Sequence, residues 1–571
     1  MNKRINSKLL AVLLFYFLIL FFRINSGEVQ PWDEGLYAMR AKVVLQYHEI
    51  IDQSSHSIGG LYSATYPPLT VWAIALSMSI LGKNLLAIRL FSLLCSTTGM
   101  IFIFLIAKRL FEEKFSYLII FAFVGTLAWN TYSRQAMTDI PLTAFFIINV
   151  WFLIKINDSK KRSQFLIYST GFALSFAAAL MTKILISFLP LIFVGIYQFQ
   201  KGKLKNKIWL LSASVLAIII SLPWYIYMID HHGWEFMKPF TAPQIYSAVE
   251  NNTQNLGAGY YFNQLIVSNP FLILTFAVLV ILIFRFKKFR NITGGSNNFI
   301  YWIMLIWFFG MFGMFSIAET KLPHYVVYMI PPGLFLASLY YKTHDELIKN
   351  VRVRWIIFSL LTLTFIWSLS FELRQSIKLI LTAKEFNVWG VFYLLLISIF
   401  FIISIFANRE VITKILKYSF IKLSYLFLIV LVTRTIILNS FFTPGNILGG
   451  EAILGGKAAA GILNRMHIKS FLYLYHEHNN SDSLNPQLAW YTKGWTCGWI
   501  KGKTFKPMPM KKNSVDFKVL DNTTNYPDLP IVYYTTQYTK LTRTDVQILE
   551  RERPIINREK DYIIFGYKRS P

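Results

Sequence analysis

The chain has 571 residues, of which 55% are hydrophobic, 17% aromatic and only 15% charged. A water-soluble domain of that length needs far more polar surface, so the composition excludes an ordinary soluble enzyme and indicates a protein embedded in membrane lipid. The formal net charge of +28 does not call for a nucleic-acid partner, because Lys and Arg of membrane proteins collect in cytoplasmic loops beside anionic lipid. The two cysteines, Cys95 and Cys497, cannot form a disulfide framework.

Apolar runs long enough to cross a bilayer, about 20 residues each, follow one another through most of the chain. The first run follows the basic segment MNKRINSK and has no small-residue cleavage site, so we interpret it as a retained helix. About thirteen membrane-spanning helices are expected, near residues 9–24, 86–107, 115–131, 140–156, 165–182, 184–199, 208–229, 266–284, 299–317, 324–341, 355–371, 389–407 and 420–438.

The run 67–82 decides the topology. If it crosses the bilayer, the Lys- and Arg-rich loops that follow lie outside; if it lies along the membrane surface, they share the side of the basic N-terminus. The positive-inside rule favours the second arrangement, with a cytoplasmic N-terminus. The run begins with Tyr66, Pro67 and Pro68, and a proline pair suits a helix start. Trp72 suits an amphipathic helix at the interface.

Two domains are expected on this basis. Residues 1–438 form an all-α polytopic bundle, with residues 25–85 as an outer, catalytic loop that contains the surface helix. Residues 439–571 form a small α/β domain on the periplasmic side. The alternation of apolar and polar residues in KSFLYLYHE, LPIVYYTTQ and DYIIFGYKR predicts strands there.

Two acidic motifs fall at the outer ends of spans. PWDEGLYA follows the first span and carries Asp33 and Glu34, which suit a general base or a metal ligand at the membrane surface. SRQAMTDIP carries Asp139 at the start of the fourth span, five residues after Arg134, whose planar fork suits phosphate. The plainer alternatives are solvated loop acids and an interfacial ion pair.

Cationic side chains also gather at the outer ends of spans. AETKLPHY carries Lys321, His324 and Tyr325, and Lys183 is flanked by apolar residues. These residues suit a lipid phosphate, while the plainer interpretation is snorkelling and anchoring. The tracts at 231–232 and 476–478 have no third metal ligand at a recognised spacing, and no phosphate-cradling loop of an ATP-binding protein occurs.

These motifs form a recognisable series. DE-x-x-YA follows the first span, a Pro-Pro-Leu surface helix comes next, then an Arg…Asp-x-Pro turn, a TK pair, and KLPHY before a PP helix. In this order, and on one side of the membrane, they resemble the membrane glycosyltransferases of the GT-C superfamily. The branch they resemble includes the lipid A aminoarabinose transferase and the protein O-mannosyltransferases (dolichyl-phosphate-mannose-protein mannosyltransferases). The resemblance covers roughly residues 9–341.

The resemblance implies an enzyme of the bacterial inner membrane. Such enzymes transfer a sugar from a polyprenyl-phosphate donor to a lipid, glycan or protein acceptor at the outer face, usually with inversion. The family's two acids map onto Asp33, with Glu34 adjacent, and onto Asp139. Its KLP-x-Y turn and TK pair map onto Lys321, Pro323, Tyr325, Thr182 and Lys183.

The chain also departs from the aminoarabinose transferase. That enzyme carries a Glu-Lys pair before the proline of its surface helix, where this chain has Thr65-Tyr66. It carries a metal-binding His before its eighth span, and this chain has none between Gly233 and Gln264. No cofactor is therefore certain, and any divalent ion would take Asp33 and Glu34 as ligands. The donor phosphate is expected to meet Arg134, Lys183, Lys321, His324 and Tyr325.

Two other functions remain open from the sequence. A transporter or flippase of lipid-linked sugars has a similar number of helices, but it places polar residues at the bilayer midplane. A polymerase or ligase of surface polysaccharide shares the lipid-linked donor. The charges of this chain gather outside, which favours the transferase.

Overall fold

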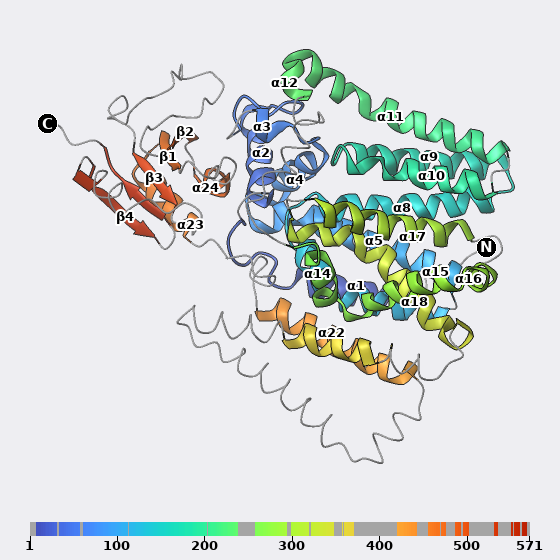
Figure 1. Ribbon diagram of the computed structural model, residues 1–571. Coiled ribbons are helices and arrows are strands. Elements are labelled where there is room, and N and C mark those ends of the chain that lie inside the picture. The colour runs from blue at the N-terminus through green and yellow to red at the C-terminus, as the bar shows by residue number, and fades with distance from the viewer. Residues whose placement is uncertain are drawn as a thin grey trace, which may run out of the picture.

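The computed structural model describes most of the helical bundle and parts of the C-terminal region (Figure 1). The described residues are 7–30, 33–57, 61–111, 113–201, 204–237, 257–293, 298–318, 321–347, 357, 359–370, 420–441, 455–468, 470–475, 486–492, 495–501, 530–534, 550–551, 553–559 and 562–567.

Helices dominate the first part of the chain. The elements of the bundle are α1 (Ser7–Phe21), α5 (Leu85–Leu110), α6 (Glu113–Val124), α7 (Leu127–Ser133), α8 (Asp139–Asp158), α9 (Arg162–Leu180), η1 (Ile186–Phe188), α10 (Leu189–Lys201), α11 (Leu204–His232), α14 (Tyr260–Ser268), η3 (Pro270–Leu272), α15 (Ile273–Phe284), α16 (Phe286–Thr293), α17 (Asn298–Ile317), η4 (Pro323–Met329), α18 (Ile330–Leu347) and α22 (Phe420–Phe441). Four further helices lie between these spans, namely α2 (Asp33–Tyr47), α3 (Leu61–Ala64), α4 (Leu69–Leu81) and α12 (Trp234–Met237).

Apolar helices coincide with most of the predicted spans that the structure describes. Among the described residues, 5 helices are long and apolar enough to cross a membrane, or up to 6 if the bent pair of α6 and α7 is one span. Shorter apolar helices occupy most other predicted spans, while 389–407 lies outside the described residues. The chain is therefore a mostly helical integral membrane protein, and the count of thirteen stays a prediction.

The surface segment is a helix, as predicted. Pro68 precedes α4, whose 13 residues make a helix of about 20 Å, short of the hydrocarbon thickness of about 30 Å. Leu69 N donates to Met181 O (3.0 Å), which fixes the helix start against the end of α9. Its position along the membrane surface stays a prediction.

The predicted continuous span 115–131 is broken instead. α6 and α7 meet at a 65° bend at Gly125, where an added Cβ would lie 2.7 Å from Leu431 Cβ. Arg434 donates to the freed Gly125 O (3.0 Å) and to Ser268 O (2.9 Å). Breaks inside a bundle persist only where such partners satisfy the backbone. The bend directs the chain toward Asp139, at the start of α8.

The C-terminal region contains a 5-stranded sheet of order β2-β1-β3-β5-β4. β1 pairs in parallel with β2 and β3, whereas β5 pairs antiparallel with β3 and β4. The three segments with predicted alternation contain β1, β3 and β5. The elements are α23 (Gly456–Arg465), β1 (Ser470–Tyr475), α24 (Pro486–Tyr491), β2 (Trp495–Lys501), β3 (Ile531–Tyr534), β4 (Ile555–Glu559) and β5 (Tyr562–Phe565).

This sheet and its helices lie beside α2 at one end of the bundle (Figure 1). Met39 of α2 belongs to the same apolar cluster as Leu463, Leu488 and Ile564. The C-terminal region thus shares a core with the helix that begins at Asp33.

Candidate active site

Asp33 is the first residue of α2, where its charge complements the helix dipole. Its side chain is 37% exposed, and its Oδ2 lies 3.8 Å from His324 Nε2. Burial among the surrounding side chains raises the pKa of Asp33. The charge of Asp139 raises it further, against the opposing effects of His324 and Lys183. Asp33 is therefore a reachable carboxylate that no close ion pair holds among the described residues.

Asp139 is the second acid, at the start of α8, and it is buried. Its Oδ1 accepts hydrogen bonds from Tyr328 OH (2.5 Å) and Lys183 Nζ (3.2 Å). Lys183 Nζ also lies 5.0 Å from the ring centroid of Tyr325 and donates to Tyr328 OH (3.4 Å). The structure thus gathers Asp139, Lys183 and Tyr325 into one group, beside Asp33 and His324.

Tyrosines that the sequence interpretation missed surround these charges. Tyr328 follows Tyr325 by three residues in the 3₁₀-helix η4, so both side chains share a face. Tyr132 packs edge-on against His324, with ring centroids 5.9 Å apart. Tyr37 OH lies 3.5 Å from Thr138 Oγ1. The i, i+3 spacing of tyrosines in HYVVYM is the signal that would have found Tyr328.

Tyr66, just before the surface helix, also faces this group. Its pKa is raised by burial, then lowered by the charge of Lys183 and raised by those of Asp33 and Asp139. Pro67 and Pro68 follow it at the entry to α4. The surface segment thus contributes one aromatic side chain to the surroundings of the two acids.

Glu34 lies in a different environment from its neighbour. Its carboxylate accepts from Arg89 Nε (2.8 Å) and Nη2 (3.0 Å), from Gln30 N (2.7 Å) and from Ala136 N (3.0 Å). Neither Glu34 nor Arg89 has exposed side-chain area. Four donors leave this carboxylate little capacity for a substrate or a metal ion.

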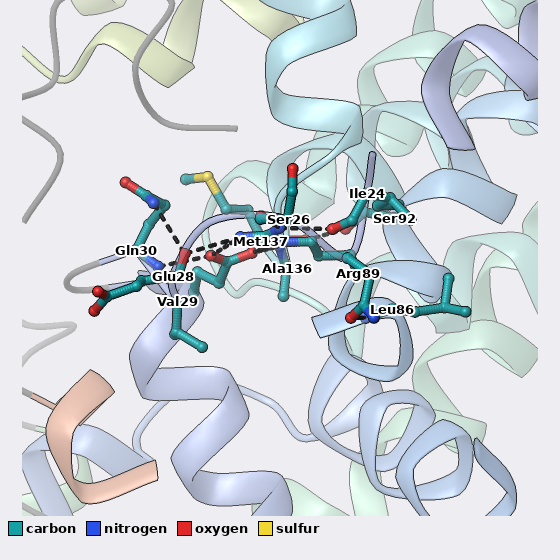
Figure 2. Close-up of polar contacts among 12 residues, drawn as sticks. Ile24, Ser26, Glu28, Val29, Gln30, Leu86, Arg89, Ser92, Ala136 and Met137 are labelled. Carbon is teal, nitrogen blue, oxygen red and sulfur yellow. Dashed lines mark hydrogen bonds and ion pairs between the residues drawn. The ribbon is translucent and has the colours of Figure 1, made fainter. Parts of the chain in front are cut away.

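Arg89 of α5 joins several segments through this ion pair. It donates to three backbone carbonyls of the loop after α1, at Ile24 (2.7 Å), Ser26 (3.0 Å) and Glu28 (3.1 Å). Figure 2 shows these residues together with Ala136. Because Ala136 lies three residues before Asp139, one buried ion pair connects the segments that carry both acids.

Two predicted phosphate ligands contact backbone carbonyls. Arg134 is buried, and its Nη2 donates to Phe22 O (2.8 Å). Lys321 Nζ donates to Ser316 O (2.9 Å) and to Ala318 O at the end of α17. Cations often satisfy the carbonyls that a helix end leaves unpaired.

A metal site is not supported by the part of the chain that the structure describes. There, no group of three or more His, Cys, Asp and Glu side chains could hold a metal ion. Glu34, a predicted metal ligand, is already occupied by four donors. His232 Nε2 lies 2.6 Å from Asp52 Oδ2, and His231 stacks on Tyr227. The tract at 476–478 lies outside the described residues.

Chemically, the site combines a proton acceptor with an anion-binding cation. Asp33 can accept a proton from a hydroxyl, and Lys183, oriented by Asp139, can stabilise negative charge nearby. Three tyrosines near these charged groups provide aromatic surface, namely Tyr66, Tyr132 and Tyr325.

Comparisons with known proteins agree with this picture. Residues 65–227 match a family model described as dolichyl-phosphate-mannose-protein mannosyltransferase. An "Uncharacterized protein" of Aquifex aeolicus is 24% identical over 381 residues, 65% of this chain and 71% of the relative. An undecaprenyl phosphate-alpha-4-amino-4-deoxy-L-arabinose arabinosyl transferase 2 of Pseudomonas fluorescens is 25% identical over 341 residues, 58% of this chain. The alignment spans about half (55%) of that enzyme.

Solved structures show the same fold. ArnT from Cupriavidus metallidurans bound to undecaprenyl phosphate matches with a TM-score of 0.67 at 14% identity, covering 98% of this chain and 97% of ArnT. Archaeal AglB from Archaeoglobus fulgidus matches with a TM-score of 0.50 at 10% identity, covering 96% of this chain and 70% of AglB. The resemblance predicted from the sequence is thus confirmed: part of the chain is similar to the aminoarabinose and mannosyl transferases, and the chain has the fold of ArnT.

Proposed function

We propose that this protein transfers a sugar from a polyprenyl-phosphate carrier to an acceptor at the outer face of a bacterial inner membrane. The observation that carries the proposal is the reachable Asp33 carboxylate, 3.8 Å from His324 and beside the buried group of Asp139 and Lys183. The similarity to aminoarabinose transferases supports a lipid-linked donor. The sugar and the acceptor stay open between lipid, glycan and protein.

Asp33 acts as the base in this proposal. It takes the proton of the acceptor hydroxyl, whose oxygen forms a bond to the anomeric carbon of the sugar. The bond from that carbon to the phosphate oxygen breaks at the same time, and the lipid phosphate leaves with the electron pair. Attack from the face opposite the leaving group inverts the anomeric carbon.

Lys183 stabilises the departing phosphate. Negative charge develops on the leaving oxygen in the transition state, so a preoriented ammonium there lowers the barrier. Asp139 and Tyr328 hold Lys183, whose Nζ lies 5.0 Å from the ring centroid of Tyr325. His324 lies 3.8 Å from Asp33. The polyprenyl tail can remain in lipid because its phosphate reaches only the membrane interface.

The remaining predicted site residues take supporting roles. Glu34 orients the segment that carries Asp33, because its carboxylate is filled by Arg89 and backbone donors. Arg134 and Lys321 donate to the backbone carbonyls of Phe22 and Ser316, and their contact with the donor phosphate stays a prediction.

The contacts of α2 also bear on the orientation of the protein in the membrane. The hydrogen bonds from Lys42 of α2 to Ala489 O and Thr492 O support a C-terminal region on the same side of the membrane as Asp33. With an odd number of spans between the N-terminus and the C-terminal region, the N-terminus is cytoplasmic and the C-terminal region periplasmic. This orientation agrees with the distribution of Lys and Arg in the sequence.

The test is transfer from a radiolabelled polyprenyl-phosphate sugar in membranes that contain the full-length protein. Asp33→Asn is compared with Asp158→Asn, a matched change at the opposite end of α8, where Asp158 forms a partly exposed pair with Arg109. We expect Asp33→Asn to lose transfer and Asp158→Asn to retain it. Full activity of Asp33→Asn would remove Asp33 from the mechanism. Movement of the lipid-linked sugar across the bilayer without transfer would favour the flippase.

A further inference from the structure

The segment that carries Asp33, described at residues 28–30 and 33–42, is held from two sides. On one side lies the bundle, through the Glu34–Arg89 pair and the Tyr37–Thr138 contact. On the other side lie α23 and α24, with the adjoining residues Gly455 and Thr492. We call the contacts on this second side the C-terminal clamp.

Ionisable side chains form the two ends of the clamp, Lys42 at one end and Glu28 at the other. Lys42 is buried, and its Nζ donates to Ala489 O and Thr492 O, both at 2.8 Å, at the end of α24. The Glu28 carboxylate accepts from Gly455 N and Lys457 N, both at 3.1 Å, at the start of α23. A cation at a helix C-terminus and an anion at a helix N-terminus each complement the helix dipole.

Closer to Asp33 the clamp contacts the backbone of this segment. Val29 N donates to Tyr491 OH (2.8 Å). A Cβ added to Gly35, two residues after Asp33, would lie 2.8 Å from Gln487 N and 3.1 Å from its Cα. Backbone atoms cannot rotate away as a flexible side chain can, so α24 and α2 must separate to admit even one methyl group at Gly35.

We propose that this clamp positions Asp33 for the reaction, so that the C-terminal region is a positioning element of the active site. This inference rests on the proposed function. None of the clamp residues touches the reacting groups; they act through the position of α2.

The geometry explains why such support matters. Asp33 lies 3.8 Å from His324, beyond hydrogen-bond distance, so its placement depends on the helix that carries it. A misplacement of about 1 Å in a reacting group can cost about 100-fold in rate. Glu34 fixes α2 toward the bundle, and the clamp contacts α2 at Gly35 and Lys42.

The experiment uses full-length Gly35→Ala, with Gly461→Ala as the matched control. Gly461 lies in α23 of the same region, and a Cβ there meets nothing within 4 Å. We expect Gly35→Ala to lower kcat by about 100-fold. The KM for the lipid donor should stay near the wild-type value, because Lys183 is untouched. The acidic limb of the pH–rate profile should move, because that limb reports the surroundings of Asp33. Gly461→Ala should match the wild type in all three measurements.

Two milder variants keep the test decisive if Gly35→Ala folds poorly. Tyr491→Phe removes one hydrogen bond without changing volume and should lower kcat a few-fold with the same pattern. Lys42→Met should lower kcat by about 10-fold, and Lys42→Arg, which can reach the same carbonyls, should restore part of the loss.

The outcomes separate this inference from the proposed function. If Asp33→Asn is inactive while the clamp variants keep the wild-type kcat and pH–rate profile, the clamp does not position Asp33. The same conclusion follows if the clamp variants lose only the amount of folded protein. If Asp33→Asn itself keeps full activity, the proposed function fails.

Discussion

Asp33 and Glu34 are neighbours in the sequence, yet their carboxylates lie in regions with opposite properties. The Glu34 carboxylate is fully buried, and it accepts short hydrogen bonds from Arg89 and from backbone amides. The Asp33 region leaves a partly exposed carboxylate whose pKa burial raises. A satisfied carboxylate stabilises the fold, whereas an unsatisfied one keeps its capacity for a substrate.

The largest expected effect is a loss of stability when the Glu34–Arg89 ion pair is broken. Arg89→Met leaves the Glu34 charge buried without its partner, which should lower the free energy of unfolding by about 3–5 kcal/mol. Thermal or denaturant unfolding of the purified protein in detergent measures it. A loss below 1 kcal/mol would show that Glu34 and Arg89 are not the anchor of this segment.

The second expected effect is a lower rate when Asp139, which orients Lys183, loses its hydrogen bond from Tyr328. Tyr328→Phe removes the 2.5 Å hydrogen bond to Asp139, a bond to a charged group, and should lower kcat by about 10- to 100-fold. Since Tyr328 is buried, the fraction of folded protein is measured beside the rate. Unchanged kcat in folded protein would show that Asp139 needs no second donor to orient Lys183.

A smaller effect on the transfer rate is expected when the pH is lowered. The pKa of Asp33 is raised by burial above its ordinary value of 3.8, and the base must be ionised, so transfer should fall as the pH drops through a limb above 3.8. The contribution of Asp33 to the free energy of unfolding has the opposite pH dependence. The folded state binds this proton more tightly, so the contribution of Asp33 to stability falls as the pH rises through that window. A pH–rate profile with no acidic limb above 3.8 would contradict the assignment.

The smallest effect is expected far from both regions. Arg109→Ala removes a partly exposed pair with Asp158 at the other end of α8, and it should change the free energy of unfolding by less than about 1 kcal/mol. Transfer should be unchanged. A large loss there would mean that stability is less concentrated around Arg89 than the contacts indicate.

The sequence predicts the gathering of Asp33, Asp139, Lys183, His324 and Tyr325 because charges are costly beside lipid and the topology places these five on one side. It does not predict how Arg134 and Lys321 are used. Helix ends and the loop after α1 present unpaired carbonyls, and these become visible only when the spans are packed. Both cations contact carbonyls in the structure.

The partner of Glu34 is likewise hidden in the sequence. Arg89 lies near the start of an apolar run and looks like an interfacial anchor, and only the approach of α5 to the loop after α1 brings it to Glu34. The break at Gly125 is hidden for the same reason, since α6 and α7 read as one apolar run. Tertiary contacts with Arg434 stabilise that bend.

The most direct measurement compares Asp33→Asn and Glu34→Gln in one preparation, with transfer per folded molecule and unfolding both recorded. We expect Asp33→Asn to lose transfer by about 100- to 10,000-fold while remaining at least as stable as the wild type. Glu34→Gln should lose stability by about 3–5 kcal/mol while its folded fraction keeps much more activity. The reverse pattern, with an active Asp33→Asn and a stable but inactive Glu34→Gln, would contradict the account.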